Sequence, residues 1–212
     1  RWEGRGSAGA GASSDTLPDP RLLTRADYGP AYRQCEQLGI TALLRLGYSG
    51  RGVVLCMLDG GFFRGHEVFD RTDVVAAIDF VEGDTTVGFD PTRPQGGYNT
   101  RAMNAHGTYT WSTLGGFRAG RHVGPAYRAS FALGRTEIVE AEIRLEEDRY
   151  VAGLEWADGL GADIVSTSLG YLSFPAQGFA YSYEELDGRT AVTTRAAARL
   201  TERGVLLVTA MG

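Results

Sequence analysis

Three groups of residues in this sequence have the types and spacing to act together in catalysis. Asp59 ends an apolar run and is followed by two glycines, which would leave its carboxylate at a sharp turn. His106 stands where a helix is expected to begin, and the dipole there helps to keep the imidazole neutral and available as a base. Backbone groups that pair with an extended peptide are expected at the end of another apolar strand, at Ser168, Leu169 and Gly170.

Each of these features, taken alone, also has an ordinary structural explanation. An aspartate after a strand often caps a turn, a single histidine is more often structural than catalytic, and a strand can simply run into a loop. His66 and His122 lie in no comparable setting, and we expect them to be structural. The order and combination of the three groups therefore carry the argument for catalysis.

Strands and helices are expected to alternate along the chain and to position these groups. The pattern predicts strands over 53–58, 127–133, 164–169 and 205–210, and helices near residue 106 and over 148–160 and 190–203. A broken helix, or two short ones, is expected over 30–46 with an interruption at Gly39. This alternation predicts an α/β fold of three layers, with a mostly parallel sheet covered by helices on both faces.

The motifs, in this order, resemble those of the subtilisin-like serine peptidases, the subtilase family. The similar segments are 50–60, 106–108, 163–170 and 205–212, and the resemblance runs from about residue 48 to residue 212. It implies a subtilisin-like fold in which Asp59 orients His106. The histidine would take a proton from a serine that attacks a peptide carbonyl. It also implies that the strand ending at Ser168, Leu169 and Gly170 pairs with the substrate backbone.

The sequence departs from the family pattern at three positions near these motifs. Gly60 replaces the usual Ser or Thr, and Tyr109 and Trp111 replace the commoner His and Ala. We expect these changes to alter packing near the site without abolishing it.

The nucleophilic serine and the oxyanion-hole asparagine are expected beyond residue 212. The chain would then be the N-terminal portion of a catalytic domain, incomplete at its C-terminus and inactive without the remainder of that domain. A non-catalytic pseudoenzyme or a peptide-binding fragment stays open as an alternative. A phosphoryl-transfer domain that uses Asp59 as nucleophile is another, but it needs a metal-binding carboxylate beside Asp59, and Gly60 and Gly61 supply none.

The expected organisation is a flexible lead-in over 1–27, rich in Gly, Ala and Ser, followed by the N-terminal part of a subtilisin-like peptidase domain over 28–212. The given chain shows no signal peptide, and the family resemblance implies a secreted or cell-envelope protein. No apolar run reaches the roughly 18 residues of a membrane span.

Composition argues against two classes of binding partner. A net charge of −5 and a pI near 5.3 lack the electrostatic footprint of a protein that binds nucleic acid or anionic membranes. The family resemblance implies a polypeptide substrate. Cys35 and Cys56 match no zinc or redox pattern, and Cys56 lies in an apolar run that predicts a buried side chain.

No cofactor is expected, although two clusters of side chains are left with open roles. An acidic group could bind a structural calcium ion, but its last members are also explained by the N-terminal dipole of the helix that follows; it comprises Glu137, Glu140, Glu142, Glu146, Glu147 and Asp148. Five aromatic residues after Gly170 could line substrate pockets or simply anchor a surface loop; they are Tyr171, Phe174, Phe179, Tyr181 and Tyr183.

Overall fold

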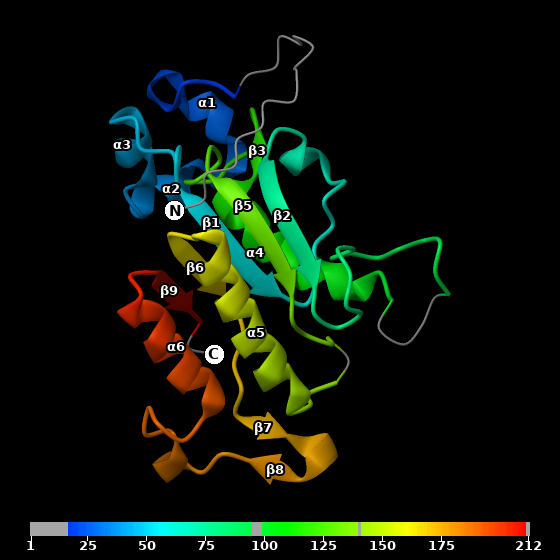
Figure 1. Ribbon diagram of the computed structural model, residues 1–212. Coiled ribbons are helices and arrows are strands. Elements are labelled where there is room, and N and C mark those ends of the chain that lie inside the picture. Colours follow the sequence, from blue (N-terminus) through cyan, green and yellow to red (C-terminus); the bar gives the residue numbers. More distant parts are fainter. Residues whose placement is uncertain (1–16, 95–98, 140, 211–212) are drawn as a thin grey trace.

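A parallel sheet of five strands forms the centre of the molecule (Figure 1). The fold is that of a computed structural model, which describes residues 17–94, 99–139 and 141–210. The strand order is β2-β5-β1-β6-β9, and all neighbouring strands are parallel. The strands are β1 (Val54–Asp59), β2 (Asp73–Asp79), β5 (Ser130–Arg135), β6 (Ile164–Thr167) and β9 (Leu206–Thr209). Their carboxyl ends share one edge of the sheet, which is where ligands and catalytic groups gather in such folds.

Helices cover both faces of the sheet. Helix α4 (Ala105–Gly115) lies on one face, and α5 (Leu145–Leu160) and α6 (Val192–Glu202) lie side by side on the other (Figure 1). Helix α5 ends at Gly161, whose positive φ of 72° favours glycine. This arrangement confirms the three-layer α/β fold predicted from the sequence.

Strand β1 is apolar along its length because both of its faces are covered. Leu55 and Met57 belong to the core on the α4 side, whereas Cys56 and Leu58 belong to the core shared with α5 and α6. The side chain of Cys56 is fully buried and unpaired, as its apolar setting predicted. This alternation is the two-residue period of a strand, and it fixes the face on which Asp59 emerges.

A group of short helices precedes the sheet. They are α1 (Arg25–Tyr28), α2 (Tyr32–Gln37) and α3 (Ile40–Arg45). Gly39 separates the last two with a φ of 73°, which confirms the interruption expected at this residue. None of the described helices is long and apolar enough to cross a membrane.

The prediction of a flexible lead-in over 1–27 is wrong for the last residues of that range. A short 3₁₀ helix spans Pro20–Leu22, and Leu23 is buried in the core formed by the N-terminal helices. The Tyr127 hydroxyl donates to the Pro18 carbonyl oxygen at 2.8 Å, so contacts from distant residues order this stretch. Residues 1–16 lie outside the described residues, and the division into lead-in and domain otherwise stays a prediction.

Two strands of the sheet differ from expectation. Sequence analysis missed β2, an edge strand whose apolar run 74–78 is only partly buried. It also expected β9 to be buried, yet β9 is the last described strand on its side, with Leu206 57% and Val208 51% exposed. Burial of an edge strand depends on what lies beside it, which its own sequence does not encode.

Several element boundaries also shift. Strand β5 begins at Ser130 and not at residue 127, because residues 125–128 form a turn, and β6 ends at Thr167. Helix α5 begins three residues earlier than expected. Two small antiparallel pairs complete the fold: β3 (Phe117–Arg118) with β4 (His122–Val123), and β7 (Ser173–Phe174) with β8 (Phe179–Ala180).

Candidate active site

Asp59 is the last residue of the central strand β1, and its side chain is only 1% exposed. Its Oδ1 accepts a hydrogen bond from the backbone N–H of Gly60 at 2.7 Å, and the Thr110 hydroxyl donates to its Oδ2 at 3.1 Å. Burial raises the pKa of Asp59, while the hydrogen bonds with His106, Gly60 and Thr110 oppose that rise. The carboxylate is thus fixed in position by donors on three sides.

His106 lies in the first turn of α4 and faces this carboxylate. Its Nδ1 lies 2.8 Å from Oδ1 and 3.0 Å from Oδ2 of Asp59. With Asp59 ionised, Nδ1 carries the proton, and Nε2 on the far side of the ring holds the free electron pair. The His106 side chain is 54% exposed, so this base is open to an incoming group. The two residues, distant in sequence, lie together as the family resemblance implied.

Gly107 allows helix α4 to approach the end of β1 this closely. A Cβ at this position would lie 2.2 Å from the Gly61 carbonyl oxygen and 3.0 Å from the Asp59 Cβ. The next residue, Thr108, accepts a hydrogen bond from the Phe63 backbone N–H at 2.8 Å. The loop after β1 is therefore tied to the helix that carries His106.

The three departures from the family pattern have different structural settings. A Cβ on Gly60 would lie 2.7 Å from Cγ2 of Val139, so the Val139 side chain occupies the space next to this glycine. Trp111 is fully buried and stacks on Phe69 with ring centroids 3.6 Å apart. Tyr109 is 70% exposed. The change in packing that we expected from this residue is therefore not found in the buried core.

Ser168, Leu169 and Gly170 directly follow strand β6 at the carboxyl edge of the sheet. Leu58 of β1 pairs with Thr167 of β6, so Ser168 follows at the level of Asp59. Strand β6 itself is not an edge, because it is paired with β1 on one side and β9 on the other. The backbone groups of 168–170 lie beyond that pairing and form no hydrogen bond with another described residue. Their role in binding substrate stays a prediction.

Glu137 and Tyr171 form a polar pair at the same edge, and sequence analysis missed it as a pair. The Tyr171 hydroxyl donates to Oε1 of Glu137, and the Thr136 hydroxyl donates to the same oxygen at 3.2 Å. Burial, together with the nearby Glu146, raises the pKa of Glu137 to about 8. A Cβ on Gly60 would lie 3.9 Å from the Glu137 Cβ, so the pair adjoins the turn after Asp59. One feature of the sequence could have pointed to Glu137: it follows the end of a strand, as Gly60 does.

Most of the described acidic residues considered for calcium have protein partners. Glu146 accepts backbone N–H groups of Ile138 at 2.6 Å and Ile143 at 3.1 Å, and Glu147 accepts the Tyr181 hydroxyl at 2.7 Å. Glu140 lies outside the described residues. Within the described ranges, no cluster of three or more His, Cys, Asp or Glu side chains is placed to bind a metal ion. Calcium binding stays a prediction.

The aromatic loop after Gly170 packs largely on itself. Phe174 is fully buried and Tyr181 is 8% exposed, and together with Ala191 they form a separate small core. Tyr183, in contrast, is 86% exposed. Of the two explanations left open, the packing favours a surface loop anchored by its own aromatic side chains.

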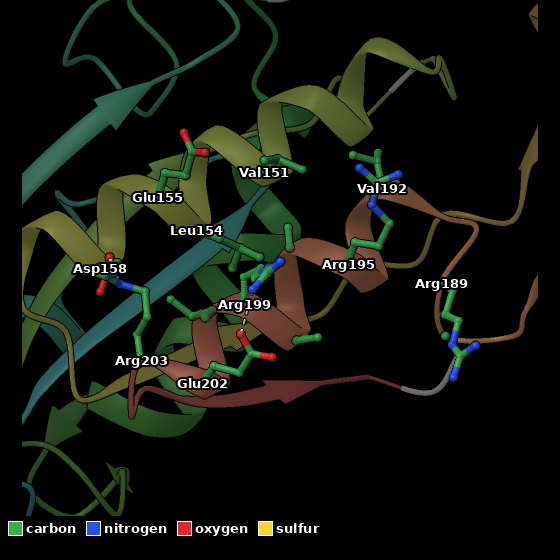
Figure 2. A pocket seen from close by; sticks show the side chains of 14 residues that line it. Val151, Leu154, Glu155, Asp158, Arg189, Val192, Arg195, Arg199, Glu202 and Arg203 are labelled. Carbon is green, nitrogen blue, oxygen red and sulfur yellow. Dashed lines mark hydrogen bonds and ion pairs between the residues drawn. The ribbon is translucent and has the colours of Figure 1, made fainter.

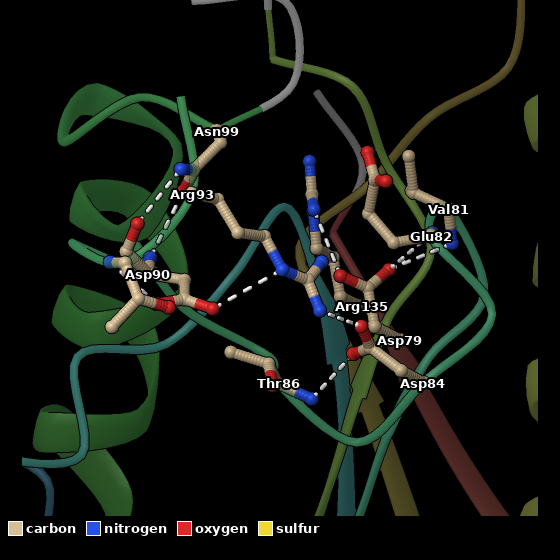
Figure 3. Close-up of polar contacts among 10 residues, drawn as sticks. Asp79, Val81, Glu82, Asp84, Thr86, Asp90, Arg93, Asn99 and Arg135 are labelled. Atoms are coloured by element: carbon tan, nitrogen blue, oxygen red, sulfur yellow. Dashed lines mark hydrogen bonds and ion pairs between the residues drawn. The ribbon is translucent and has the colours of Figure 1, made fainter. Parts of the chain in front are cut away.

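A polar network holds the connection between β2 and α4 next to the site (Figure 3). Arg135, which pairs in register with Asp59, forms a buried ion pair with Asp79 at 2.8 Å. The Asp79 backbone accepts the Asp84 N–H at 3.2 Å and donates to the Asp84 carbonyl, and the Asp84 side chain is ion-paired with Arg93. These contacts anchor the loop that leads to His106.

The remaining histidines have partners other than the Asp59–His106 pair, and His66 also lines a small pocket at the start of α4. Nδ1 of His66 accepts the Val68 backbone N–H at 3.2 Å, and Nε2 of His122 contacts the Ser112 carbonyl at 2.8 Å, as expected of structural histidines. A groove of about 600 Å³ runs between α5 and α6 and is lined by arginines and aliphatic side chains (Figure 2). It contains none of the candidate site residues.

The geometry also bears on the phosphoryl-transfer alternative. A nucleophilic aspartate needs an accessible oxygen, but Asp59 is almost fully buried and both of its oxygens accept hydrogen bonds. The exposed group is the imidazole. The arrangement is suited to orienting a base and not to nucleophilic attack by Asp59.

Comparisons with known proteins identify the fold and the family of the chain. Among solved structures, the chain is similar to a cold adapted subtilisin-like serine proteinase, with 19% identity and a TM-score of 0.54 over 78% of this chain and 48% of the other. Fervidolysin from Fervidobacterium pennivorans, a keratinolytic enzyme related to subtilisin, matches with 19% identity and a TM-score of 0.60 over 92% of this chain and 27% of its own. MycP1 matches with 20% identity and a TM-score of 0.57 over 82% and 47%.

At such identities the likeness is one of fold, and this chain spans half or less of the length of these structures. No curated protein matches the sequence significantly. The model of the subtilase family, in contrast, matches residues 50–212. Since that match covers most of the sequence and includes both Asp59 and His106, the chain belongs to the subtilase family.

Proposed function

We propose that the full-length protein is a serine endopeptidase and that Asp59 and His106 are two members of its Asp-His-Ser triad. The observation that supports this most directly is the 2.8 Å contact between Asp59 Oδ1 and His106 Nδ1, with the imidazole half exposed at the carboxyl edge of the sheet. Membership of the subtilase family gives the same reaction class.

In this mechanism the two residues divide the work. Asp59 stays ionised, holds the Nδ1–H tautomer of His106 and stabilises the imidazolium that forms. Nε2 of His106 takes the proton from the serine hydroxyl as the serine oxygen attacks the peptide carbonyl. It then returns that proton to the leaving amine. The fixed donors around Asp59 keep its carboxylate in place through both steps.

The substrate is a polypeptide, held as an extended strand along Ser168, Leu169 and Gly170. Their backbone groups lie beyond the pairing of β6 and can hydrogen-bond with a further strand. This segment follows β6 at the level of Asp59, so a peptide bound there passes close to the triad.

The nucleophilic serine and the oxyanion-hole asparagine are supplied by the remainder of the catalytic domain. Loss of an oxyanion donor alone typically lowers the rate by about 10²–10³. We therefore propose that residues 1–212 are inactive by themselves. A secreted or cell-envelope location accompanies the proposal and rests on family membership.

Fluorophosphonate labelling of the full-length protein tests the proposal. An activated serine is expected to react with the label. Peptide hydrolysis should then fall in proportion to the fraction of the protein that is labelled. In subtilisin, loss of the catalytic histidine lowers kcat by about 2 × 10⁶, and we expect His106→Ala to have an effect of this order. His122→Gln is the matched control, because His122 contacts only the Ser112 carbonyl among the described polar partners.

A folded full-length protein that neither takes the label nor hydrolyses peptides would instead be a pseudoenzyme or a peptide-binding protein. Equal activity of His106→Ala and the unaltered protein would also contradict the assignment of the base.

A further inference from the structure

A pocket that the proposed triad does not use lies beside His106. It has a volume of about 330 Å³ and lies between the loop after β1, the segment before α4 and the first turns of α4. Ala105, one of the residues that line it, is the immediate neighbour of His106 in the chain. His106 does not itself line the pocket, but Tyr109, another lining residue, follows it by about one turn of α4, so the pocket lies next to the base on that helix.

The walls of the pocket combine the rings of three aromatic residues with the polar side chains of His66, Arg101, Asn104 and Thr108. Phe63, Phe89 and Tyr109 contribute rings, of which Phe63 is 51% and Tyr109 is 70% exposed. The guanidinium of Arg101 lies over the Phe89 ring, 4.7 Å from its centroid. Exposed rings that face a cavity next to a reactive group favour an apolar guest with a π face, because such a guest removes apolar surface from water and packs edge to face.

The pocket is fixed relative to His106 by hydrogen bonds to the same helix. The Phe63 backbone N–H donates to the Thr108 hydroxyl oxygen at 2.8 Å. Asn104, which is 6% exposed and precedes α4, accepts the Phe89 backbone N–H on its side-chain oxygen at 2.9 Å. Two of the three aromatic walls are therefore tied to the start of the helix that carries the base. A side chain bound there takes a defined position relative to the scissile bond.

We propose that this pocket binds an aromatic side chain of the polypeptide substrate close to the scissile bond, so that Tyr109 and Phe63 determine specificity. The inference rests on the proposed peptidase function. It gives a role to Tyr109, the residue that departs from the family pattern and that the buried core does not use. The exposure of Phe63 has the same explanation.

The experiment compares peptide substrates that differ at one position near the cleaved bond, with phenylalanine or alanine there. For the full-length protein we expect kcat/KM to be about tenfold higher for the phenylalanine peptide. Tyr109→Ala should lower this ratio to about two or three, whereas Tyr109→Phe should keep it because the ring remains. Tyr48→Ala is the matched control: Tyr48 is 68% exposed and lies before the amino end of β1.

A second measurement separates this inference from the proposed function. Calorimetric binding of the same two peptides at low temperature reports on the pocket even if no peptide is hydrolysed. Absence of hydrolysis would contradict the peptidase function, while tighter binding of the phenylalanine peptide that is lost in Tyr109→Ala would support the pocket. Equal binding and equal kcat/KM for both peptides at every position next to the cleaved bond would overturn it. Thermal unfolding of each variant shows that the fold is retained.

Discussion

Asp59 is the last residue of β1, and Glu137 lies two residues after the end of β5, so both are at the carboxyl edge of the parallel sheet. The side chain of Asp59 is buried and that of Glu137 is partly buried, but their hydrogen-bond partners differ. Asp59 accepts hydrogen bonds from a backbone N–H, a hydroxyl and an imidazole N–H that can become positively charged. Glu137 faces two hydroxyls and the neighbouring carboxyls of Glu142 and Glu146. Burial raises the pKa of both groups, and it raises that of Glu137 to about 8.

The difference shows how two carboxyl groups at one edge of a sheet take different roles. The donors around Asp59 include an imidazole that would gain a full positive charge in the proposed mechanism, which favours a carboxylate. Among the described residues no cationic donor contacts Glu137, and with a pKa of about 8 Glu137 is largely protonated at neutral pH. In the proposed mechanism Asp59 would stabilise charge, whereas Glu137 forms a neutral hydrogen bond that connects Tyr171 to the end of β5.

The largest expected effect comes from exchanging each carboxyl for an amide. In subtilisin, loss of the catalytic aspartate lowers kcat by about 3 × 10⁴, and we expect Asp59→Asn to cost about 10⁴ because the amide favours the wrong tautomer of His106. Glu137→Gln is the matched change and should lower kcat by less than about tenfold. Steady-state hydrolysis by the full-length protein measures both. Similar losses of kcat in the two variants would contradict the different roles proposed for Asp59 and Glu137.

The pH dependence of stability gives the second test. The folded state binds the Glu137 proton more tightly than the unfolded chain, where the pKa is near 4.5. Stability from this group is therefore fully present below about pH 4.5 and is lost as the pH rises toward about 8. The loss should be on the order of a few kcal/mol, at about 1.4 kcal/mol for each unit of pKa difference.

Denaturant unfolding of the full-length protein between pH 5 and pH 9 measures this slope. In Glu137→Gln, which cannot ionise, the part of the slope due to this residue should disappear. An unchanged pH profile in that variant would show that Glu137 has an ordinary pKa in the folded state.

The smallest effect concerns the close approach that gives Asp59 its imidazole partner. Gly107→Ala places a Cβ 2.2 Å from the Gly61 carbonyl oxygen, so α4 must shift away from β1, and we expect a destabilisation of about 1–3 kcal/mol. Gly159→Ala is the matched control within helix α5, where a Cβ meets no atom within 4 Å. It should stabilise the protein by about 0.5–1 kcal/mol. Thermal unfolding of both variants should give shifts of opposite sign.

The sequence predicted those features of the fold that depend on residues close together in the chain. The apolar run that ends at Asp59 predicted β1, and the onset of a helix at His106 predicted the setting of the base. Two motifs on elements of known direction in a parallel sheet are enough to bring these residues to one edge. The family resemblance added their pairing.

The rest depends on contacts between distant residues. Burial raises the pKa of Glu137, and the hydrogen bond from Tyr171, 34 residues further along the chain, opposes that rise. No local pattern encodes that burial or that contact. Residues 17–27 likewise have a contact with a distant residue, because the Tyr127 hydroxyl donates to the Pro18 carbonyl oxygen. Strand β2 was missed because it is half exposed and begins and ends in aspartate, so its apolar run is short.

The position of β1 has a consequence for how the protein loses activity. The strand pairs with β5 along its full length, Val54–Asp59, and with β6 over Leu55–Leu58, and its side chains fill the cores on both faces. In local unfolding, peripheral segments open first and doubly flanked central strands open last, which amide hydrogen exchange records. We therefore expect the backbone that carries Asp59 to be among the slowest-exchanging parts of the chain. Partial opening on heating should reach the surrounding loops before it disturbs the carboxylate.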